Sequence, residues 1–195
     1  MSRLSQQLAF ILEIDQLKSI LRQTPITGPE RRRENDAEHS WHLAVAAALL
    51  AEYAPAAIDL ARVIRMLLIH DIVEIDAGDT FAYDAAAYAD KEERECRAAD
   101  RIFGILPADQ SAAFRALWDE FEAATTPESR YANALDRLQP LLLNSRTGGG
   151  SWSTHRVTRA QVLTRMEPIR HGAPELWSVV LTLVDDASAR GWLIS

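Results

Sequence analysis

The segment MLLIHDIVEIDAGDT, residues 66–80, decides the fold because it begins as an apolar helix and then carries five ionisable side chains. On a helix, positions three and four apart share a face, so Glu74 lies one turn beyond both His70 and Asp71. The neighbouring positions are apolar, so this polar face points toward the interior or a cleft. Because a buried unpaired charge is unfavourable, the three groups should pair or bind a cation. Asp76 is read as a solvent-facing or helix-ending residue.

Two other apolar segments contain the same kind of exception. His39 and His42 lie one turn apart at the start of an alanine-rich segment, and Asp136 lies within NALDRLQPLLL. Each group alone has a structural explanation, such as a His-Asp hydrogen bond or an ion pair between Asp136 and Arg137, and for His42 a core position is favoured. Together, imidazole and carboxylate groups on three helices indicate a shared divalent metal ion.

Helical periodicity dominates the chain, and no run of alternating β-branched residues predicts a strand. The fold class is therefore all-α, a single domain over residues 1–195 with a core at about 8–145 and C-terminal helices at about 156–192. The pattern predicts about seven to nine helices. The main ones are expected at 8–21, 35–54, 58–75, 85–104, 109–123, 129–145, 159–170 and 174–190.

Two segments carry more specific expectations. The helix that follows Asn35 or Asp36 as N-cap is so rich in Ala and Leu that it should be buried on most sides. The segment RTGGGSWST, residues 146–154, is read as a linker in preference to a lid. Its glycines lack the Gly-Lys-Ser/Thr of a phosphate-binding P-loop.

Composition excludes several classes of protein. The chain has a net charge of -7, and its one basic run, Arg31 to Arg33, is read as a solvated turn in preference to a field for an anionic substrate. Duplex nucleic acid is therefore not expected as a partner. The single cysteine, Cys96, rules out a disulfide framework. No apolar run spans a bilayer and the N-terminus is unlike a signal peptide, so a cytoplasmic location without membrane contact is expected.

These residues resemble the HD-domain metal-dependent phosphohydrolases, whose pattern is His, then His-Asp, then a distant Asp, all on helices. The matching positions are His39 in AEHSWH, His70 and Asp71 in LLIHDIVE, and Asp136 in NALDRLQ. The resemblance covers about residues 8–144. It is closest to the branch of 5'-deoxynucleotidases, which carries an N-terminal LK…R element, here LKSILR ending at Arg22.

This resemblance implies roles for individual residues. One divalent metal ion, which could be Mn, Co, Zn, Fe or Mg, would be ligated by His39, His70, Asp71 and Asp136. The remaining implied roles are catalysis by Glu74, Asp79 and Arg22, and substrate binding by Arg22, Asp79 and Thr80. A homodimer is also implied. The C-terminal apolar residues could form its interface, but packing onto the core is preferred; they are Trp177, Val180, Leu183 and Trp192.

The reaction expected from the resemblance is hydrolysis of a small nucleotide, a nucleoside 5'-monophosphate, to nucleoside and phosphate. No histidine lies between Asp71 and Asp136, which argues against the two-metal branches. Alternatives that stay open are hydrolysis of guanosine tetraphosphate or a deoxynucleoside triphosphate, or a regulatory metal-binding protein. Gln23 stands where the bacterial enzymes have tryptophan, and GDTFAYD replaces a proline-containing turn, so base and sugar selectivity are open.

Overall fold

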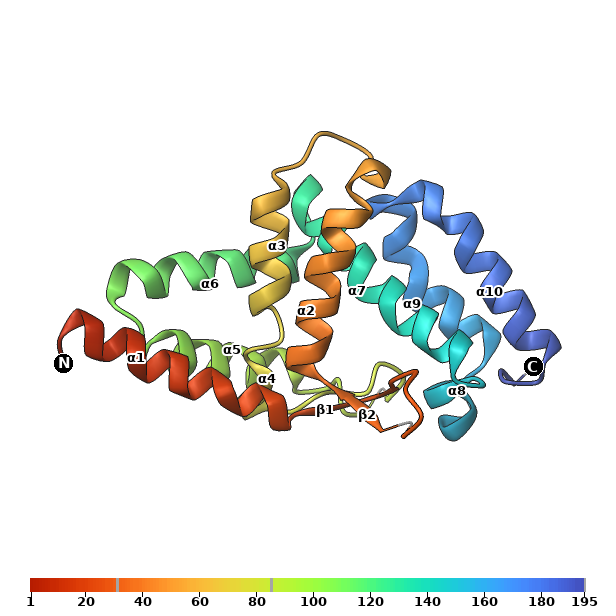
Figure 1. Cartoon of the computed structure of the whole chain (residues 1–195), viewed down its shortest axis with the longest axis horizontal. Coiled ribbons are helices and arrows are strands. Elements are labelled where there is room, and N and C mark those ends of the chain that lie inside the picture. The colour runs from red at the N-terminus through yellow and green to blue at the C-terminus, as the bar shows by residue number, and fades with distance from the viewer. Residues whose placement is uncertain (31, 85, 195) are drawn as a thin grey trace.

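The computed structural model describes residues 1–30, 32–84 and 86–194, and it confirms the all-α class (Figure 1). The elements in chain order are α1 (Arg3–Glu13), η1 (Ile14–Ser19), β1 (Leu21–Pro25), β2 (Arg33–Asn35), α2 (Asp36–Leu49), η2 (Ala51–Tyr53), α3 (Leu60–Ile69), α4 (Glu74–Ala77), α5 (Lys91–Phe103), α6 (Ala108–Ala123), α7 (Pro127–Arg146), α8 (Gly150–His155), α9 (Arg159–Gly172), η3 (Pro174–Leu176) and α10 (Trp177–Ala189). Among the described helices, none has the length and apolarity needed to cross a membrane.

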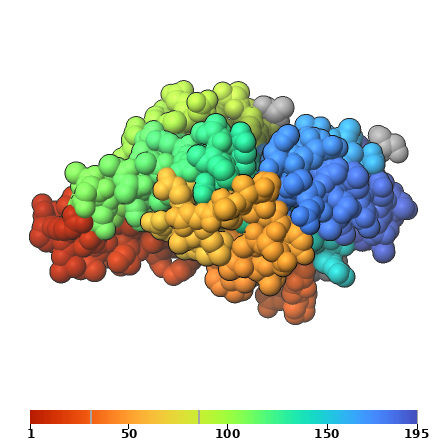
Figure 2. All heavy atoms as spheres, turned by 90° about the horizontal axis from the view of Figure 1, so that it is seen from above, coloured from red at the N-terminus to blue at the C-terminus, as the bar shows by residue number. Residues whose placement is uncertain are grey.

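The helices that carry the unusual polar residues form the centre of the molecule. Helices α2, α3 and α7 pack on one another, and α7 also packs along α9. Helices α1 and α10 lie at opposite ends of the long axis (Figure 1). Seen from above, the segment of α2 and α3 lies on the surface between those two ends (Figure 2). Burial of Leu43, Met66 and Leu135 between these helices ties them together, and the apolar burial stabilises their arrangement.

Helix α2 begins where the sequence predicted. Asn35 is its N-cap, and Asn35 and Glu38 form a reciprocal capping box. This start places His39 in the first turn, fully buried. The expectation that the helix is buried on most sides is wrong, since Trp41 is 64% exposed and Leu49 is 73% exposed. The reason is that α3, α7 and η1 pack on one side of α2 only.

The expected continuous helix over residues 58–75 is interrupted at its most polar point. Helix α3 ends at Ile69, tight turns follow, and α4 begins at Glu74. The backbone bonds change to the spacing of a 3₁₀ turn, with Glu74 N donating to Asp71 O at 2.9 Å. Gly78 then ends α4 with φ +73°, as a C-terminal glycine commonly does. His70 and Asp71 therefore lie on a turn at the end of a helix.

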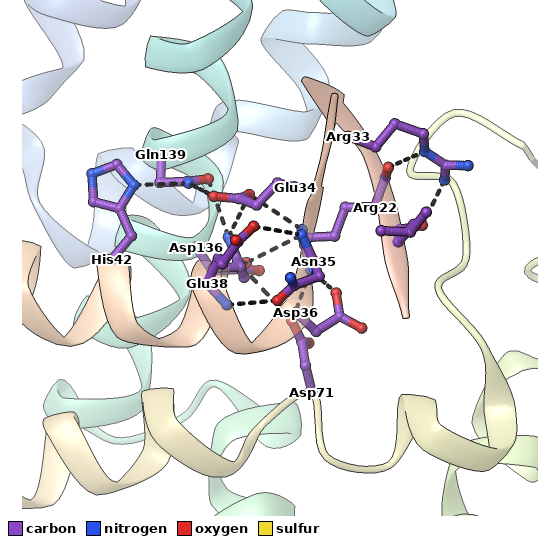
Figure 3. A network of polar contacts seen from close by, with 12 residues as sticks. Arg22, Arg33, Glu34, Asn35, Asp36, Glu38, His42, Asp71, Asp136 and Gln139 are labelled. Carbon is purple, nitrogen blue, oxygen red and sulfur yellow. Dashed lines mark hydrogen bonds and ion pairs between the residues drawn. The ribbon is translucent and has the colours of Figure 1, made fainter. Parts of the chain in front are cut away.

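The N-terminal region contains the clearest error of the sequence-based assignment. Helix α1 ends at Glu13, and residues expected to continue it form η1 and then β1, which pairs antiparallel with β2. The strands have five and three residues, too few to show an alternating pattern. This small sheet places Arg22 and Glu34 beside the start of α2 (Figure 3).

The segment expected to be a linker is a packed part of the fold. Residues 146–154 comprise the last residue of α7, a tight turn and all of α8 except its final residue, and Trp152 is only 1% exposed. Gly150 has φ +42°, and an added Cβ would lie 2.3 Å from Asn144 Oδ1. The C-terminal residues Trp177, Val180, Leu183 and Trp192 pack against the core, which was the preferred expectation for them.

Candidate metal centre

Three elements bring histidine and carboxylate groups to one buried point. His39 comes from the first turn of α2, His70 from the end of α3 and Asp136 from the middle of α7. One ligand atom from each residue lies within 4.8 Å of the others, and all three residues are buried. His39, His70 and Asp136 lie far apart in the sequence, and the packing of α2, α3 and α7 brings them together.

His39 is held by hydrogen bonds at both ring nitrogens. Its Nε2 lies 2.9 Å from Asp136 Oδ1, and its Nδ1 lies 3.1 Å from Gln139 Oε1. The amide nitrogen of Gln139 donates to Glu34 at 2.6 Å and lies 3.1 Å from Nδ1 of His42 (Figure 3). His42 therefore lies behind the cluster, where it contacts the residue that orients His39.

His70 presents a ring nitrogen that has no hydrogen-bond partner among the described residues. Its Nδ1 donates to the carbonyl oxygen of Leu67 at 3.0 Å, which leaves the lone pair on Nε2. That nitrogen is buried and unbonded, although Asp71 Oδ1 lies 3.1 Å away outside hydrogen-bond geometry. Metal-binding histidines are commonly anchored in this way through the other nitrogen. The residues of the cluster therefore fit a divalent cation.

Asp71 lies between this cluster and a second one. Asp36, Asp71 and Glu74 also have ligand atoms within 4.8 Å of one another. Arg22 donates to Asp71 Oδ2 at 2.7 Å and to Asp36 Oδ1 at 3.3 Å (Figure 3). Arg22 is thus engaged by carboxylates, and both its contact with phosphate and the ligation of metal by Asp71 stay predictions.

The charges of His39 and Asp136 are mutually dependent. Burial and Arg22 lower the pKa of His39, but hydrogen bonds with Asp136 and Glu34 outweigh them and raise it to about 9. Burial alone would raise the pKa of Asp136, whereas Arg137, His39 and His70 hold it well below its usual range. Without a cation, the centre is an ion pair between imidazolium and carboxylate.

The predicted catalytic carboxyls are in a different electrostatic state. Burial, together with Asp71 and Asp36, raises the pKa of Glu74 well above its usual range. Burial also raises the pKa of Asp79, although Arg22 opposes the shift. One oxygen of each, Glu74 Oε2 and Asp79 Oδ2, is buried and has no hydrogen-bond partner in residues 1–30, 32–84 and 86–194. Both shifts favour the protonated, neutral form of the carboxyl group.

A cavity of about 240 Å³ opens onto the centre and is lined by His70, Asp71 and Asp136. The predicted substrate residues Arg22, Asp79 and Thr80 also line it, so the structure brings all the predicted site residues except His39 to its wall. His39 lies directly behind, bonded to Asp136. Asp76 instead points to the surface and pairs with Arg101 at 2.7 Å.

Sequence reasoning missed several residues around this site. Asp36 was considered only as an N-cap, yet it is fully buried, and burial with Asp71 raises its pKa to about 7. Its spacing of three residues before His39 was the available signal. Glu34 and Gln139 gave no such signal. Four further cavity residues to which the sequence analysis gave no role in the site are Arg137, Asn144, Trp152 and Arg165, on α7, α8 and α9.

The basic run before α2 supports the hairpin. Arg33 donates to the carbonyl oxygens of Leu21, at 2.5 Å, and Arg22, while Arg32 pairs with Glu38. Both contacts are local, and Arg33 bonds to the backbone of Arg22, a residue that lines the cavity. Arg31 lies outside the described residues. Arg32 and Arg33 are exposed, as the preferred interpretation expected, but Arg33 is the first residue of β2 and does not belong to a turn.

Comparison with known proteins connects these features to one family. The family model for the HD domain matches residues 14–177. A predicted metal-dependent phosphohydrolase from Magnetospirillum magnetotacticum MS-1 has a crystal structure that is 58% identical, with a TM-score of 0.94, covering 100% of this chain and 97% of that one. A conserved hypothetical protein from Pyrococcus furiosus, 21% identical, with a TM-score of 0.60 and coverage of 90% and 98%, shares the fold.

Curated relatives are more distant. The human 5'-deoxynucleotidase HDDC2 is 27% identical over 135 residues, which are 69% of this chain and 65% of the human protein. The corresponding Xenopus laevis protein is 28% identical over 135 residues, 69% of this chain and 66% of that protein. The chain therefore spans slightly less than two thirds of the length of these relatives.

Proposed function

Because the chain belongs to the HD domain family and is a metal-dependent phosphohydrolase of that type, we propose that it hydrolyses nucleoside 5'-monophosphates, deoxynucleotides among them, to nucleoside and phosphate. The observation that carries the proposal is the unbonded Nε2 of His70, next to Asp136, at the wall of a cavity that also contains Arg22, Asp79 and Thr80. The 5'-deoxynucleotidase names of the curated relatives support the choice of substrate.

The proposed cation is held by His39, His70 and Asp136, with Asp71 as a fourth ligand. When bound, it supplies Lewis acidity for the activation of water and neutralises charge on the phosphoryl oxygens. Two imidazoles with carboxylates accept Mn, Co, Zn, Fe or Mg, and this donor set does not select one of them.

Arg22 and Glu74 have complementary proposed roles. The guanidinium of Arg22 can offer two parallel N–H donors to phosphate oxygens, a geometry that lysine lacks. Glu74 orients the attacking water and holds a proton at Oε2, the oxygen that has no partner in the structure. Its raised pKa, caused by burial and by Asp71 and Asp36, suits a group that holds and exchanges a proton.

Asp79 and Thr80 are proposed to act on the sugar side of the substrate. Both follow the end of α4 and line the cavity. Asp79 has a raised pKa and an unbonded Oδ2, so it can donate a proton to the leaving 5'-oxygen or hydrogen bond to a sugar hydroxyl. The Thr80 hydroxyl, which now accepts from Arg94 at 3.3 Å, can serve as a second sugar contact.

The proposal is tested by phosphate release from a panel of ribo- and deoxyribonucleoside 5'-monophosphates. The protein is first treated with a chelator and then supplied separately with each of the five metals. Release that depends on added metal and is strongest for monophosphates is expected. If a triphosphate or guanosine tetraphosphate is hydrolysed instead, the substrate assignment is wrong. If no nucleotide is hydrolysed by the folded, metal-loaded protein, a regulatory binding role replaces it.

A further inference from the structure

The cavity has a basic wall that the proposed roles above do not use. Arg137 from α7 and Arg165 from α9 both line the cavity. They belong to different elements from the acidic residues of the segment 70–79, which also line it. Their helices pack along each other. The positive charge of Arg137 contributes to a lowered pKa of Arg165, after burial as the main cause, so the two guanidinium groups act on one another.

Most cations of the cavity are already neutralised. Arg22 pairs with Asp71 at 2.7 Å, Lys91 pairs with Glu95 at 2.6 Å, and Arg137 pairs with Asp136. Within the described part of the chain, Arg165 is the cavity cation with no carboxylate within 4.0 Å. Its side-chain contact is with the hydroxyl of Tyr88, to which Nη1 donates at 3.3 Å.

The half-buried guanidinium of Arg165 is in an unfavourable environment, since the positive charge of Arg137 acts on it. Desolvation and repulsion both act against it, and a hydroxyl group supplies no compensating charge. An anion that enters the cavity would remove this cost. Arg137 gives the position of that anion. It bonds to Asp136 of the metal cluster, while its buried Nε has no hydrogen-bond partner in the part of the chain that the structure describes.

We propose that Arg137 and Arg165 bind the phosphate group of the substrate, so that this phosphate lies between the metal cluster and the wall formed by α7 and α9. Arg165 is then a substrate-binding residue with a free charge, while Arg22 remains occupied by carboxylates until the cation binds. This inference rests on the proposed function for the identity of the substrate. A phosphate monoester dianion suits this wall because arginine side chains bind phosphate oxygens through charge-assisted hydrogen bonds, and both Arg137 and Arg165 line the cavity.

The test measures binding of inorganic phosphate by titration calorimetry, to the chelated protein and to protein reloaded with metal. Arg165→Gln is expected to weaken phosphate binding by at least about tenfold in both states, because a charge-assisted hydrogen bond is lost. Arg159→Gln is the matched control. It removes the same charge from the same helix, where Arg159 is exposed and paired with Asp185, and it should leave phosphate affinity unchanged.

Unchanged phosphate affinity in Arg165→Gln, or failure of the wild-type protein to bind phosphate in either state, would overturn the proposal. If the glutamine variant does not fold, Arg165→Lys replaces it, with an expected loss of about threefold to tenfold for the missing fork geometry; wild-type affinity in that variant would equally overturn the proposal. Phosphate binding that depends on Arg165 without turnover of any monophosphate would refute the nucleotidase proposal alone. Turnover with unchanged binding in the variant would refute the role of Arg165 alone.

Discussion

Gln139 determines how His39 is oriented at the metal centre. Its carbonyl oxygen accepts from His39 Nδ1, and its amide donates to Glu34, so the side chain cannot rotate without loss of both bonds. Groups behind a metal-binding histidine set its tautomer and ring orientation. In this chain the arrangement directs Nε2 of His39 toward Asp136.

Gln139→Leu is therefore expected to weaken metal binding by about 10-fold to 100-fold. The substitution removes the acceptor that lies 3.1 Å from His39 Nδ1 and the amide that donates to Glu34, so only the longer contact of Nδ1 with Glu34, at 3.4 Å, is left to orient the ring. Competition with a fluorescent chelator measures the affinity. Gln110→Leu, which removes a partly buried glutamine that bonds to Gln7, serves as control. Wild-type affinity in Gln139→Leu would show that His39 does not depend on this contact.

The proton on His39 gives metal binding a defined pH dependence. The pKa of His39 is raised to about 9 from an ordinary 6.5, so this proton stabilises the metal-free fold fully below pH 6.5, and the stabilisation is lost as pH rises through about 9. A metal cation that binds His39 must displace this proton. Apparent affinity should therefore increase about tenfold per pH unit from pH 7.5 to 9 and flatten above. Equal affinities at pH 7.5 and 9, measured with the same chelator, would contradict this account.

The sequence could reveal only those site residues that stand out against their surroundings. His70, Asp71 and Asp136 interrupt apolar helices, and this contrast identifies them without a structure. Gln139 and Asp36 do not stand out. A glutamine beside a leucine run is compatible with a surface position, and an aspartate at a helix start is usually a cap. Their roles depend on contacts made across the fold.

At the level of elements, the capping signal at the start of α2 predicted that helix correctly, whereas hydrophobic periodicity missed the short elements. Asn35 and Glu38 form the capping box that begins α2. By contrast, β1, β2, α4 and α8 are too short for a period to be visible. The turn at His70 and Asp71 was also missed, because the apolar pattern of α3 continues beyond it at Ile72 and Val73. These short elements nevertheless carry Arg22, Glu34, Glu74 and Trp152.

The junction of α7 and α8 depends on a glycine that fits between fixed groups. An added Cβ on Gly150 would lie 2.3 Å from Asn144 Oδ1 and 2.7 Å from Thr147 Oγ1. The Asn144 oxygen is itself fixed by hydrogen bonds from the backbone and hydroxyl groups of Ser151, at 2.8 and 3.1 Å. These atoms cannot move away without loss of those bonds.

Gly150→Ala is expected to lower the free energy of unfolding by about 1–3 kcal/mol more than Gly148→Ala does. Both glycines have positive φ, +42° and +70°, so backbone strain is common to the two variants. Only Gly150 has neighbours within 4 Å of the added carbon. Urea unfolding measures the difference. Equal destabilisation of the two variants would mean that α8 is not packed as described.

On the scale of the whole molecule, the site is made by segments that the sequence could not place together. The cavity draws on β1, the end of α3, α7, α8 and α9. The resemblance noticed in the sequence stopped near Asn144, whereas the family model extends to residue 177. The later region supplies Trp152 and Arg165 to the cavity wall. Their contribution follows from packing of α9 against α7, which no local pattern reveals.

The account as a whole depends on one cation held by His39, His70 and Asp136. The most direct measurement is the metal content of purified protein by mass spectrometry, together with metal-dependent phosphate release from a deoxyribonucleoside 5'-monophosphate. Wild-type protein should bind one equivalent of metal at the site, whereas His39→Ala and Asp136→Ala should lose both the metal and the release while remaining folded. Exposed Asp119→Ala should lose neither. Full metal content in both site variants would contradict the central claim.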